Sequence, residues 1–219
     1  MTTPTKVLLM KPFIQLLLLA LFAQYGQAAT TYSGSWSVST AIPDYDDPGF
    51  SSTKSITVAS TAAITSVTVG LTFTGGWNGD LYAYLVHDGQ IAILLNRVGR
   101  DNGAPDGFSS SGMTITLRDE ATQDIHTSLG DIGSPSGTFQ PDGRLIDPLF
   151  VLDSDARTNL LSVFNGGDAS GNWTLFVADQ SAGETSTLQS WSLSVTTVPE
   201  PSVAALLIFP IAALFRRRR

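Results

Sequence analysis

Apolar and polar residues alternate strictly in several segments of the middle of the chain. In the segment 67–73 every second residue is apolar, and threonine or glycine fills the positions between. The segments 173–177 and 191–196 follow the same period of two. This alternation predicts β-strands that bury one face, and it favours antiparallel pairing.

A β-hairpin is predicted around residues 87–90. The sequence His-Asp-Gly-Gln separates two apolar runs, 81–86 and 91–95, and an Asp-Gly pair is a strong signal for a two-residue turn. The first run places its leucines on one face and Tyr82 and Tyr84 on the other.

Helix signals are few. Residues 155–164 predict one or two helical turns, whereas 99–112 and 130–143 are loops rich in Gly, Ser, Asp and Pro. Many short strands with such punctuation are typical of a sandwich. We therefore expect residues 30–197 to form an all-β domain, a single jelly-roll-like antiparallel β-sandwich.

The amino end has the pattern of a secretory signal peptide over residues 1–28. Lys6 and Lys11 precede the apolar run 13–23, and small residues lead up to a cleavage site after Ala28. An uncleaved anchor is the alternative. The expected consequence is export through the secretion machinery.

The carboxyl end, residues 198–219, has three parts that end in an arginine cluster. A predicted hydrophobic helix over 202–215 would be about 21 Å long, which is short for a hydrocarbon core of about 30 Å. Pro210 would also kink it. The arginines are expected on the cytoplasmic side of a membrane.

This tail resembles the PEP-CTERM sorting signal of Gram-negative bacteria. The resemblance implies recognition and cleavage by an exosortase-type membrane enzyme, transient membrane anchoring, and sorting to the cell envelope, surface or extracellular matrix. An ordinary transmembrane anchor is the alternative. The residues of the motif and the cluster are Pro199, Glu200, Pro201, Arg216, Arg217, Arg218 and Arg219.

The folded middle resembles the P domain (P/Homo B domain) that accompanies subtilisin-like proprotein convertases. The resemblance rests on short phrases that occur in the family's order, and segment 144–158 departs from it as an extra loop. It implies a β-sandwich fold and an association with serine proteases. The phrases are 42–49, 64–69, 79–81, 94–99, 119–121, 139–143, 164–166, 171–175, 178–179, 183 and 188–193.

Charge excludes one class of partner. Residues 29–198 hold 18 acidic and 6 basic side chains, a formal net charge of −12, and the whole chain lacks cysteine. Such a domain repels phosphate backbones, so nucleic acid is not an expected partner. The acidity either keeps an exported protein soluble or serves divalent cations.

No credible catalytic constellation is present in the sequence. We expect His87 and His126 to be surface histidines of a hairpin and a loop, far from any serine motif. The acidic pairs 119–120 and 153–155 are expected to be solvated loop residues rather than a glycosidase pair. The chain is therefore not expected to be an enzyme.

Calcium is the most plausible cofactor, because hard cations prefer carboxylate and carbonyl oxygens. The alternative is that the loop aspartates form turns by capping their own backbone. A weaker second set is Asp101 and Asp106. The candidate ligands, which a sandwich brings to one end, are Asp44, Asp46, Asp47, Asp80 and Asp179.

The four tryptophans offer little evidence of a sugar site. Trp173 and Trp191 follow the buried alternation and are expected in the core, whereas Trp77 lies in a glycine-rich turn. Aromatic residues exposed beside the Asp44 loop would instead favour carbohydrate.

The function these observations favour is an exported, surface-sorted, non-catalytic module for adhesion, matrix structure or partner binding. The first alternative is an accessory P domain that stabilises or recruits a subtilisin-like protease. The second is calcium-dependent polysaccharide binding. The expected partners are thus an extracellular polysaccharide, a matrix protein or a protease.

Overall fold

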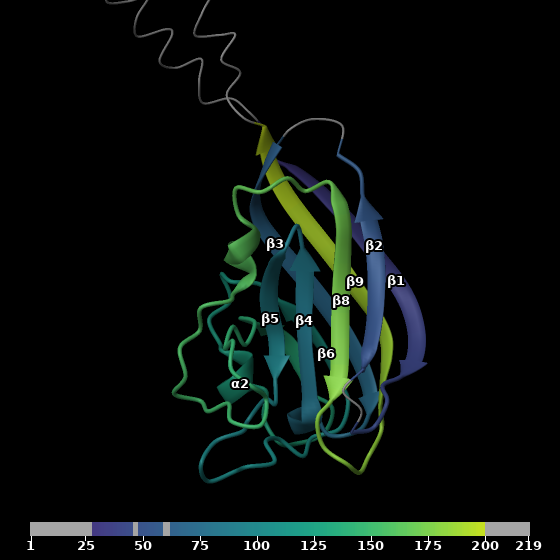
Figure 1. Ribbon diagram of the computed structural model, residues 1–219, viewed down its shortest axis with the longest axis vertical. Helices are drawn as coiled ribbons and strands as arrows, with labels where there is room; N and C mark the ends of the chain where they lie inside the picture. The colour runs from purple at the N-terminus through teal and green to yellow at the C-terminus, as the bar shows by residue number, and fades with distance from the viewer. Residues whose placement is uncertain (1–27, 46–47, 59–61, 200–219) are drawn as a thin grey trace, which may run out of the picture.

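Two β-sheets pack face to face in the computed structural model, which describes residues 28–45, 48–58 and 62–199 (Figure 1). One sheet has five strands in the order β1-β9-β3-β6-β7, and the other has four in the order β2-β8-β4-β5. The prediction of an all-β sandwich is confirmed. The strands are β1 (Thr30–Ala41), β2 (Phe50–Ile56), β3 (Ala62–Gly75), β4 (Leu81–His87), β5 (Gln90–Asn96), β6 (Met113–Leu117), β7 (Ser136–Phe139), β8 (Gly171–Asp179) and β9 (Ser186–Pro199).

Strands from opposite ends of the described chain lie side by side. β9 pairs with β1 on one side, where Thr30 is opposite Thr197, and with β3 on the other. β8 likewise lies between β2 and β4. These pairings are antiparallel as expected, but the short β7 pairs with β6 in parallel.

The core lies between the two sheets. Trp173 and Trp191 are 0% and 1% exposed, which confirms their predicted place. Inward residues of β3, β4 and β9, such as Leu71, Leu85 and Val195, are also buried, whereas those of β1 and β2 are only partly buried. Burying one such side chain stabilises the fold by about 2 kcal/mol.

The predicted hairpin joins β4 to β5. His87 pairs with Gln90, and the two turn residues have positive φ, 46° at Asp88 and 75° at Gly89. Positive φ at both central residues is the type I′ geometry, whose twist matches that of the flanking strands.

Helical structure in the described residues is limited to short turns: η1 (Asn78–Asp80), α2 (Ile125–Ser128) and η2 (Leu161–Phe164). The helix expected over 155–164 shrinks to η2. Its first amides donate to Asp119, whose carboxylate accepts from Leu161 and Ser162 at 3.0 and 2.7 Å. Asp119 therefore caps a helical turn instead of being simply solvated.

The predicted targeting segments fall almost entirely outside the described residues. Ala28 is exposed and precedes β1, and Pro199 ends β9 opposite Ala62, so the strand includes the first two residues of the predicted tail. Glu200, Pro201 and the arginine cluster lie beyond the described part. Within the described ranges, no helix has the length and apolar character needed to cross a membrane.

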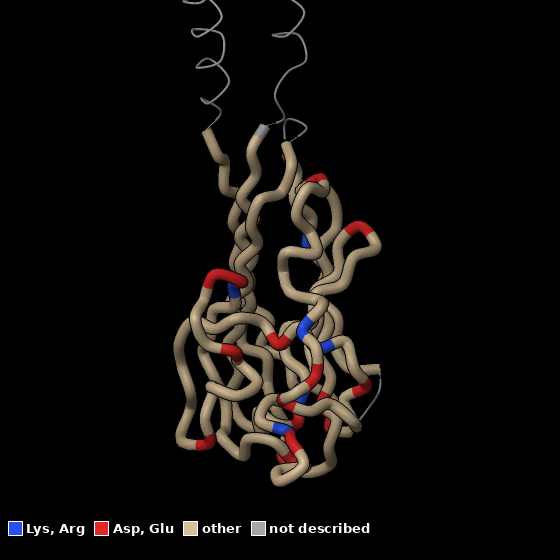
Figure 2. Tube along the Cα trace, turned by 90° about the vertical axis from the view of Figure 1, so that its left-hand side faces the viewer, with Lys and Arg blue, Asp and Glu red and all other residues tan. Residues whose placement is uncertain are grey.

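The outer faces of the two sheets differ in chemistry. The five-stranded sheet presents hydroxyl groups, with cross-strand hydrogen bonds such as Thr31–Thr196 at 3.0 Å and Ser33–Ser194 at 2.9 Å. Its long strands β1, β3 and β9 carry no charged residue, and the charges gather on loops elsewhere (Figure 2). The four-stranded sheet presents aromatic residues instead.

Candidate functional site

An open groove of about 890 Å³ lies on the outer face of the four-stranded sheet. Its floor is formed by Tyr82 and Tyr84 of β4 and Phe176 of β8. One wall comes from the connection between β1 and β2, with Tyr45 and Pro48, and the opposite wall is made by residues 147–149. The volume falls in the range of small-ligand and peptide sites.

The aromatic floor consists of ridges. Tyr84 and Phe176 are directly opposite on neighbouring strands, and their rings are stacked with centroids 4.6 Å apart and an interplanar angle of 17°. Tyr82 meets Tyr84 edge-on at 5.7 Å. Tyr84 and Phe176 each cover one face of the other ring, so those two faces are not available to an occupant of the groove.

The phenol groups stay neutral at physiological pH. Burial, followed by the neighbouring Tyr84 and the charges of Asp142 and Asp147, raises the pKa of Tyr82 to about 12. Burial also raises the pKa of Tyr84. Among the residues that line the groove, the formal charges are therefore carried by the carboxylates of Asp147 and Asp179.

One end of the groove is acidic and partly buried. Asp179 is 1% exposed; one carboxylate oxygen accepts from the Ser181 amide at 3.2 Å, and the other has no hydrogen-bond partner among the described residues. Burial and the charge of Asp44 raise its pKa to about 6, against the Ser181 hydrogen bond and Arg97. An oxygen so placed favours a positively charged or hydrogen-donating neighbour.

Asp80 forms an acidic pair with Asp179. Burial first, and then the charge of Asp179, raises the pKa of Asp80 to about 6, although the guanidinium of Arg97 opposes the shift. Arg97 lies 3.6 Å from the Asp80 carboxylate. The protein itself thus supplies one cation at this end.

The predicted calcium ligands fall into two groups. Asp44, Asp80 and Asp179 are close enough to influence one another's charge, and Asp44 also accepts the Gly183 amide at 3.1 Å. Asp46 and Asp47 lie outside the described residues. No group of three acidic or histidine side chains arranged for a metal is found in the described part of the chain, and calcium stays a prediction.

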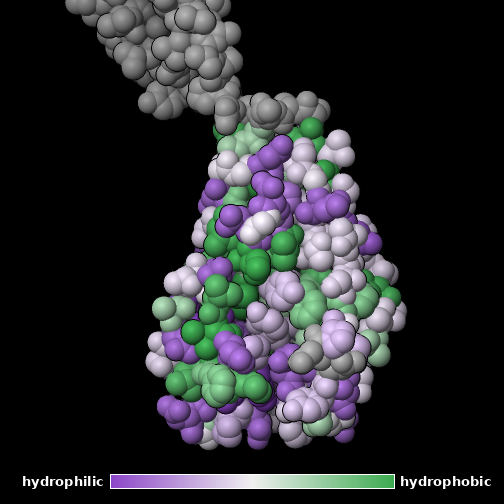
Figure 3. Space-filling view, in the orientation of Figure 1, coloured by the Kyte–Doolittle hydropathy of each residue, from purple (hydrophilic) through white to green (hydrophobic). Residues whose placement is uncertain are grey.

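The segment 144–158, expected as an extra loop, forms the groove wall and covers β5. Ile93, which pairs with the outward Tyr84, is fully buried on a strand that would otherwise expose this face. Asn96 donates its amide to the carbonyls of Arg144 and Ile146 at 3.0 and 2.9 Å. These contacts fix the start of the segment against the sheet. Apolar residues gather on this side of the molecule (Figure 3).

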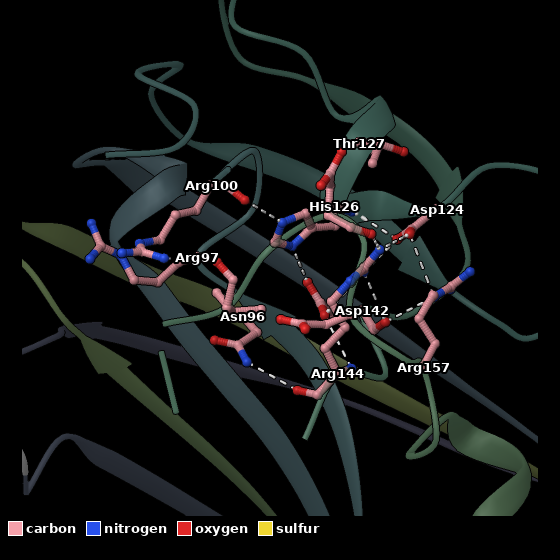
Figure 4. Close-up of polar contacts among 12 residues, drawn as sticks. Asn96, Arg97, Arg100, Asp124, His126, Thr127, Asp142, Arg144 and Arg157 are labelled. Atoms are coloured by element: carbon pink, nitrogen blue, oxygen red, sulfur yellow. Dashed lines mark hydrogen bonds and ion pairs between the residues drawn. The ribbon is translucent and has the colours of Figure 1, made fainter. Parts of the chain in front are cut away.

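A buried ionic network holds the base of this segment (Figure 4). The backbones of Arg144 and Arg157 pair in an isolated antiparallel β-bridge. Both side chains reach the Asp124 carboxylate, with nitrogen–oxygen distances of 2.8 Å for Arg144 and 3.5 Å for Arg157. Arg144 also lies 3.4 Å from Asp142, and Arg157 donates to the Asp142 carbonyl at 2.9 Å. These paired charges and hydrogen bonds give the segment a defined place, although the Nε of Arg144 has no partner among the described residues.

His126 completes the network. Its Nε2 lies 2.9 Å from the Arg100 carbonyl, which can only accept, and its Nδ1 lies 2.7 Å from Asp142. Burial lowers the pKa of His126, but the hydrogen bond and charge of Asp142 outweigh it, and the net pKa is raised. Both ring nitrogens are occupied by these buried contacts, so neither is placed to reach a substrate as a general base would.

The prediction of surface histidines is wrong. His126 is 0% and His87 is 4% exposed. His87 stacks flat on Trp173 at 3.8 Å, and its ring nitrogens contact the carbonyls of Asn172 and Asp168. Nothing in the sequence around each histidine indicated that backbone carbonyls from distant segments would contact its ring nitrogens.

Two of the remaining acidic candidates form turns. Asp155 accepts the Leu152 amide at 2.8 Å, and Asp101 accepts the Ala104 amide at 2.7 Å. Trp77 is 43% exposed and lies outside the groove. The groove was missed at the sequence level, although the outward Tyr82 and Tyr84 were a signal for it.

One known family matches part of the chain. Residues 144–195 match the proprotein convertase P-domain, which is a non-catalytic accessory domain, in line with the prediction that the chain is not an enzyme. The match covers less than half of the chain. The match includes segment 144–158, which the sequence analysis expected to be an extra loop that departs from the family. The search of curated proteins found no match.

Two solved structures are similar to this chain. One is the serine protease of Aeromonas sobria in complex with its chaperone, with 20% identity and a TM-score of 0.45. The other is the same organism's serine protease, with 17% identity and a TM-score of 0.44. Each alignment covers 83% of this chain but only 29% of the protease chain.

Proposed function

We propose that this protein is a P-domain-type accessory module that binds and stabilises a subtilisin-like serine protease domain. The single observation that supports this proposal is the match of residues 144–195 to the proprotein convertase P-domain. The module contributes a folded surface to its partner, and the partner contributes the catalysis.

The position of the matched segment strengthens the proposal. It contains β8 and most of β9, each of which lies between two other strands of its sheet. It also contains the whole of segment 144–158, which forms the groove wall. The similarity therefore includes the frame of the sandwich and one of its surface features.

The adhesion or matrix role that the sequence favoured receives no support from the comparisons, and the proposal follows the first alternative. Export, sorting by an exosortase-type enzyme and membrane anchoring depend on residues 1–28 and 198–219. They remain expectations from the sequence.

A capture experiment tests the proposed function. The full chain, immobilised, is incubated with extract and culture fluid of the cells that produce it, and bound proteins are labelled with a fluorophosphonate probe for active serine hydrolases. We expect one labelled, subtilisin-like protease. The matched control is the same chain unfolded by heat before immobilisation. Absence of a labelled protease, or equal capture by the unfolded chain, would contradict the proposal.

A further inference from the structure

The groove between Tyr45 and residues 147–149 has the chemistry of a peptide site. On its floor Tyr84 and Phe176 are stacked on each other and Tyr82 meets Tyr84 edge-on, so the rings pack against one another and form ridges. A sugar stacks best on an open face, whereas a proline or another apolar side chain inserts between ridges, as in aromatic grooves that bind extended proline-containing segments.

The rim adds apolar contact area. Tyr45 is 69% and Leu149 is 50% exposed, and Pro48 and Pro148 stand beside them. Large side chains left in water on both walls mark a surface that gains free energy when a partner covers it.

The charge of the groove selects the sign of its occupant. Asp147 and Asp179 line it, and neither Lys nor Arg does so among the described residues. One oxygen of the buried Asp179 also lacks a hydrogen-bond partner within the described part of the chain. An occupant with a cationic side chain would complement both carboxylates.

One wall of the groove is anchored on its amino-terminal side. Residues 147–149 follow directly after Ile146, whose carbonyl accepts from Asn96, and Arg144, which belongs to the ionic network with Asp124. Asp147 also accepts the Leu149 amide at 2.8 Å, which fixes the turn at the rim. A preformed wall reduces the entropy lost on binding.

We propose that this groove binds an extended polypeptide segment of a partner protein, in which a Lys or Arg lies next to proline or other apolar side chains. The proline or apolar side chains occupy the slots beside Tyr84 and Phe176, and the cationic side chain meets Asp147 at the rim or Asp179 at the acidic end. The inference rests on the proposed function only for the identity of the partner.

The test measures binding of two fluorescein-labelled peptides to the full chain by fluorescence polarisation, with excess chelator present. One peptide is Pro-Leu-Pro-Arg-Pro-Leu, and the other has Glu in place of Arg. We expect the arginine peptide to bind at least about tenfold more tightly, because like charges repel at the rim. Added salt should weaken its binding.

Paired variants separate the two parts of the site. Asp147→Asn keeps the acceptor for the Leu149 amide but removes the charge, and should weaken the arginine peptide about fivefold. Phe176→Leu removes one ridge and should weaken both peptides about fivefold or more. The matched controls are Asp88→Asn in the hairpin turn and Ile132→Ala, which removes an exposed apolar side chain elsewhere.

Three results would overturn the inference: no binding of the arginine peptide, equal binding of the two peptides, or unchanged binding by both groove variants. A neutral β-1,4-linked glucose hexamer that binds more tightly than the peptide would assign the groove to polysaccharide. The capture experiment distinguishes this failure from that of the proposed function. A protease captured equally by the groove variants leaves the proposed function standing, whereas peptide binding without protease capture leaves only the groove.

Discussion

His126 and Asp142 form a fully buried pair, with 2.7 Å between the imidazole Nδ1 and a carboxylate oxygen and no exposed surface on either side chain. The pair resembles part of a catalytic triad, yet the other ring nitrogen is taken by a backbone carbonyl. Its effect is structural, since it balances the charges that hold the groove wall.

The His126 pair predicts a dependence of stability on alkaline pH. The folded-state pKa of His126 lies above its ordinary value of 6.5, so the stabilisation is complete below that value. It is lost as pH rises through the raised pKa. Urea unfolding should give a lower free energy of unfolding at pH 9 than at pH 6.

The variant His126→Leu tests the assignment. It should lower the free energy of unfolding by about 3 kcal/mol at pH 6, because Asp142 loses its buried partner. In this variant the free energy of unfolding should also lose most of its decline above pH 6.5. Thr127→Ala, at the exposed residue next to His126, is the control. An unchanged decline in the leucine variant would assign it to another group.

Asp179 predicts a second pH effect, at acidic pH. Its folded-state pKa is raised from 3.8 to about 6, so the stability linked to it is present below pH 3.8 and lost as pH rises through 6. Asp179→Asn should therefore raise the free energy of unfolding at pH 7.5 by about 1 to 2 kcal/mol and leave it nearly unchanged at pH 4. Asp88→Asn is the matched control. A destabilised Asn variant at pH 7.5 would mean that the charge is needed there.

Calcium binding remains to be tested at the same end of the sandwich. If Asp44 and Asp179 bind calcium, a concentration ten times the Kd adds about 1.4 kcal/mol and raises Tm by about 3 to 6 °C. Asp44→Ala should abolish the shift. Differential scanning calorimetry with calcium or chelator provides the measurement. An unchanged Tm at millimolar calcium would leave Arg97 as the cation at this site.

Asn96 predicts how firmly the groove wall is attached. Asn96→Asp preserves the shape but sets a buried carboxylate against the two carbonyls that now accept from the amide. The free energy of unfolding should fall by about 3 kcal/mol or more. Urea unfolding measures it, with Asn159→Asp at an exposed amide as control. Equal effects of the two changes would contradict a special role for Asn96.

The strands were predictable because one buried face imposes a period of two on the sequence. The alternation alone predicted the buried positions of β3 and β9 without knowledge of the strands with which they pair. These positions include Val69, Leu71, Phe73, Trp191 and Leu193. The Asp-Gly turn was also predictable from local sequence, because its positive φ angles require residue types that tolerate them at those two positions.

The site was not predictable in this way because its contacts join distant parts of the chain. Arg144 meets Asp124 across 20 positions, and Tyr84 meets Phe176 across two strands. Sequence showed that Tyr82 and Tyr84 point outward, but only the strand register places Phe176 beside them. The buried histidines were missed because three of their four ring contacts are with backbone carbonyls, which have no sequence signature, and the fourth is with Asp142, 16 positions from His126.

The proposed protease association is tested most directly by the heat inactivation of the captured serine protease, with and without the purified full chain. The account predicts that the chain lengthens the half-life of activity at elevated temperature severalfold, because a partner that binds the folded protease stabilises it. The chain alone should not cleave casein. An unchanged half-life at saturating chain, or casein cleavage by the chain alone, would contradict the account.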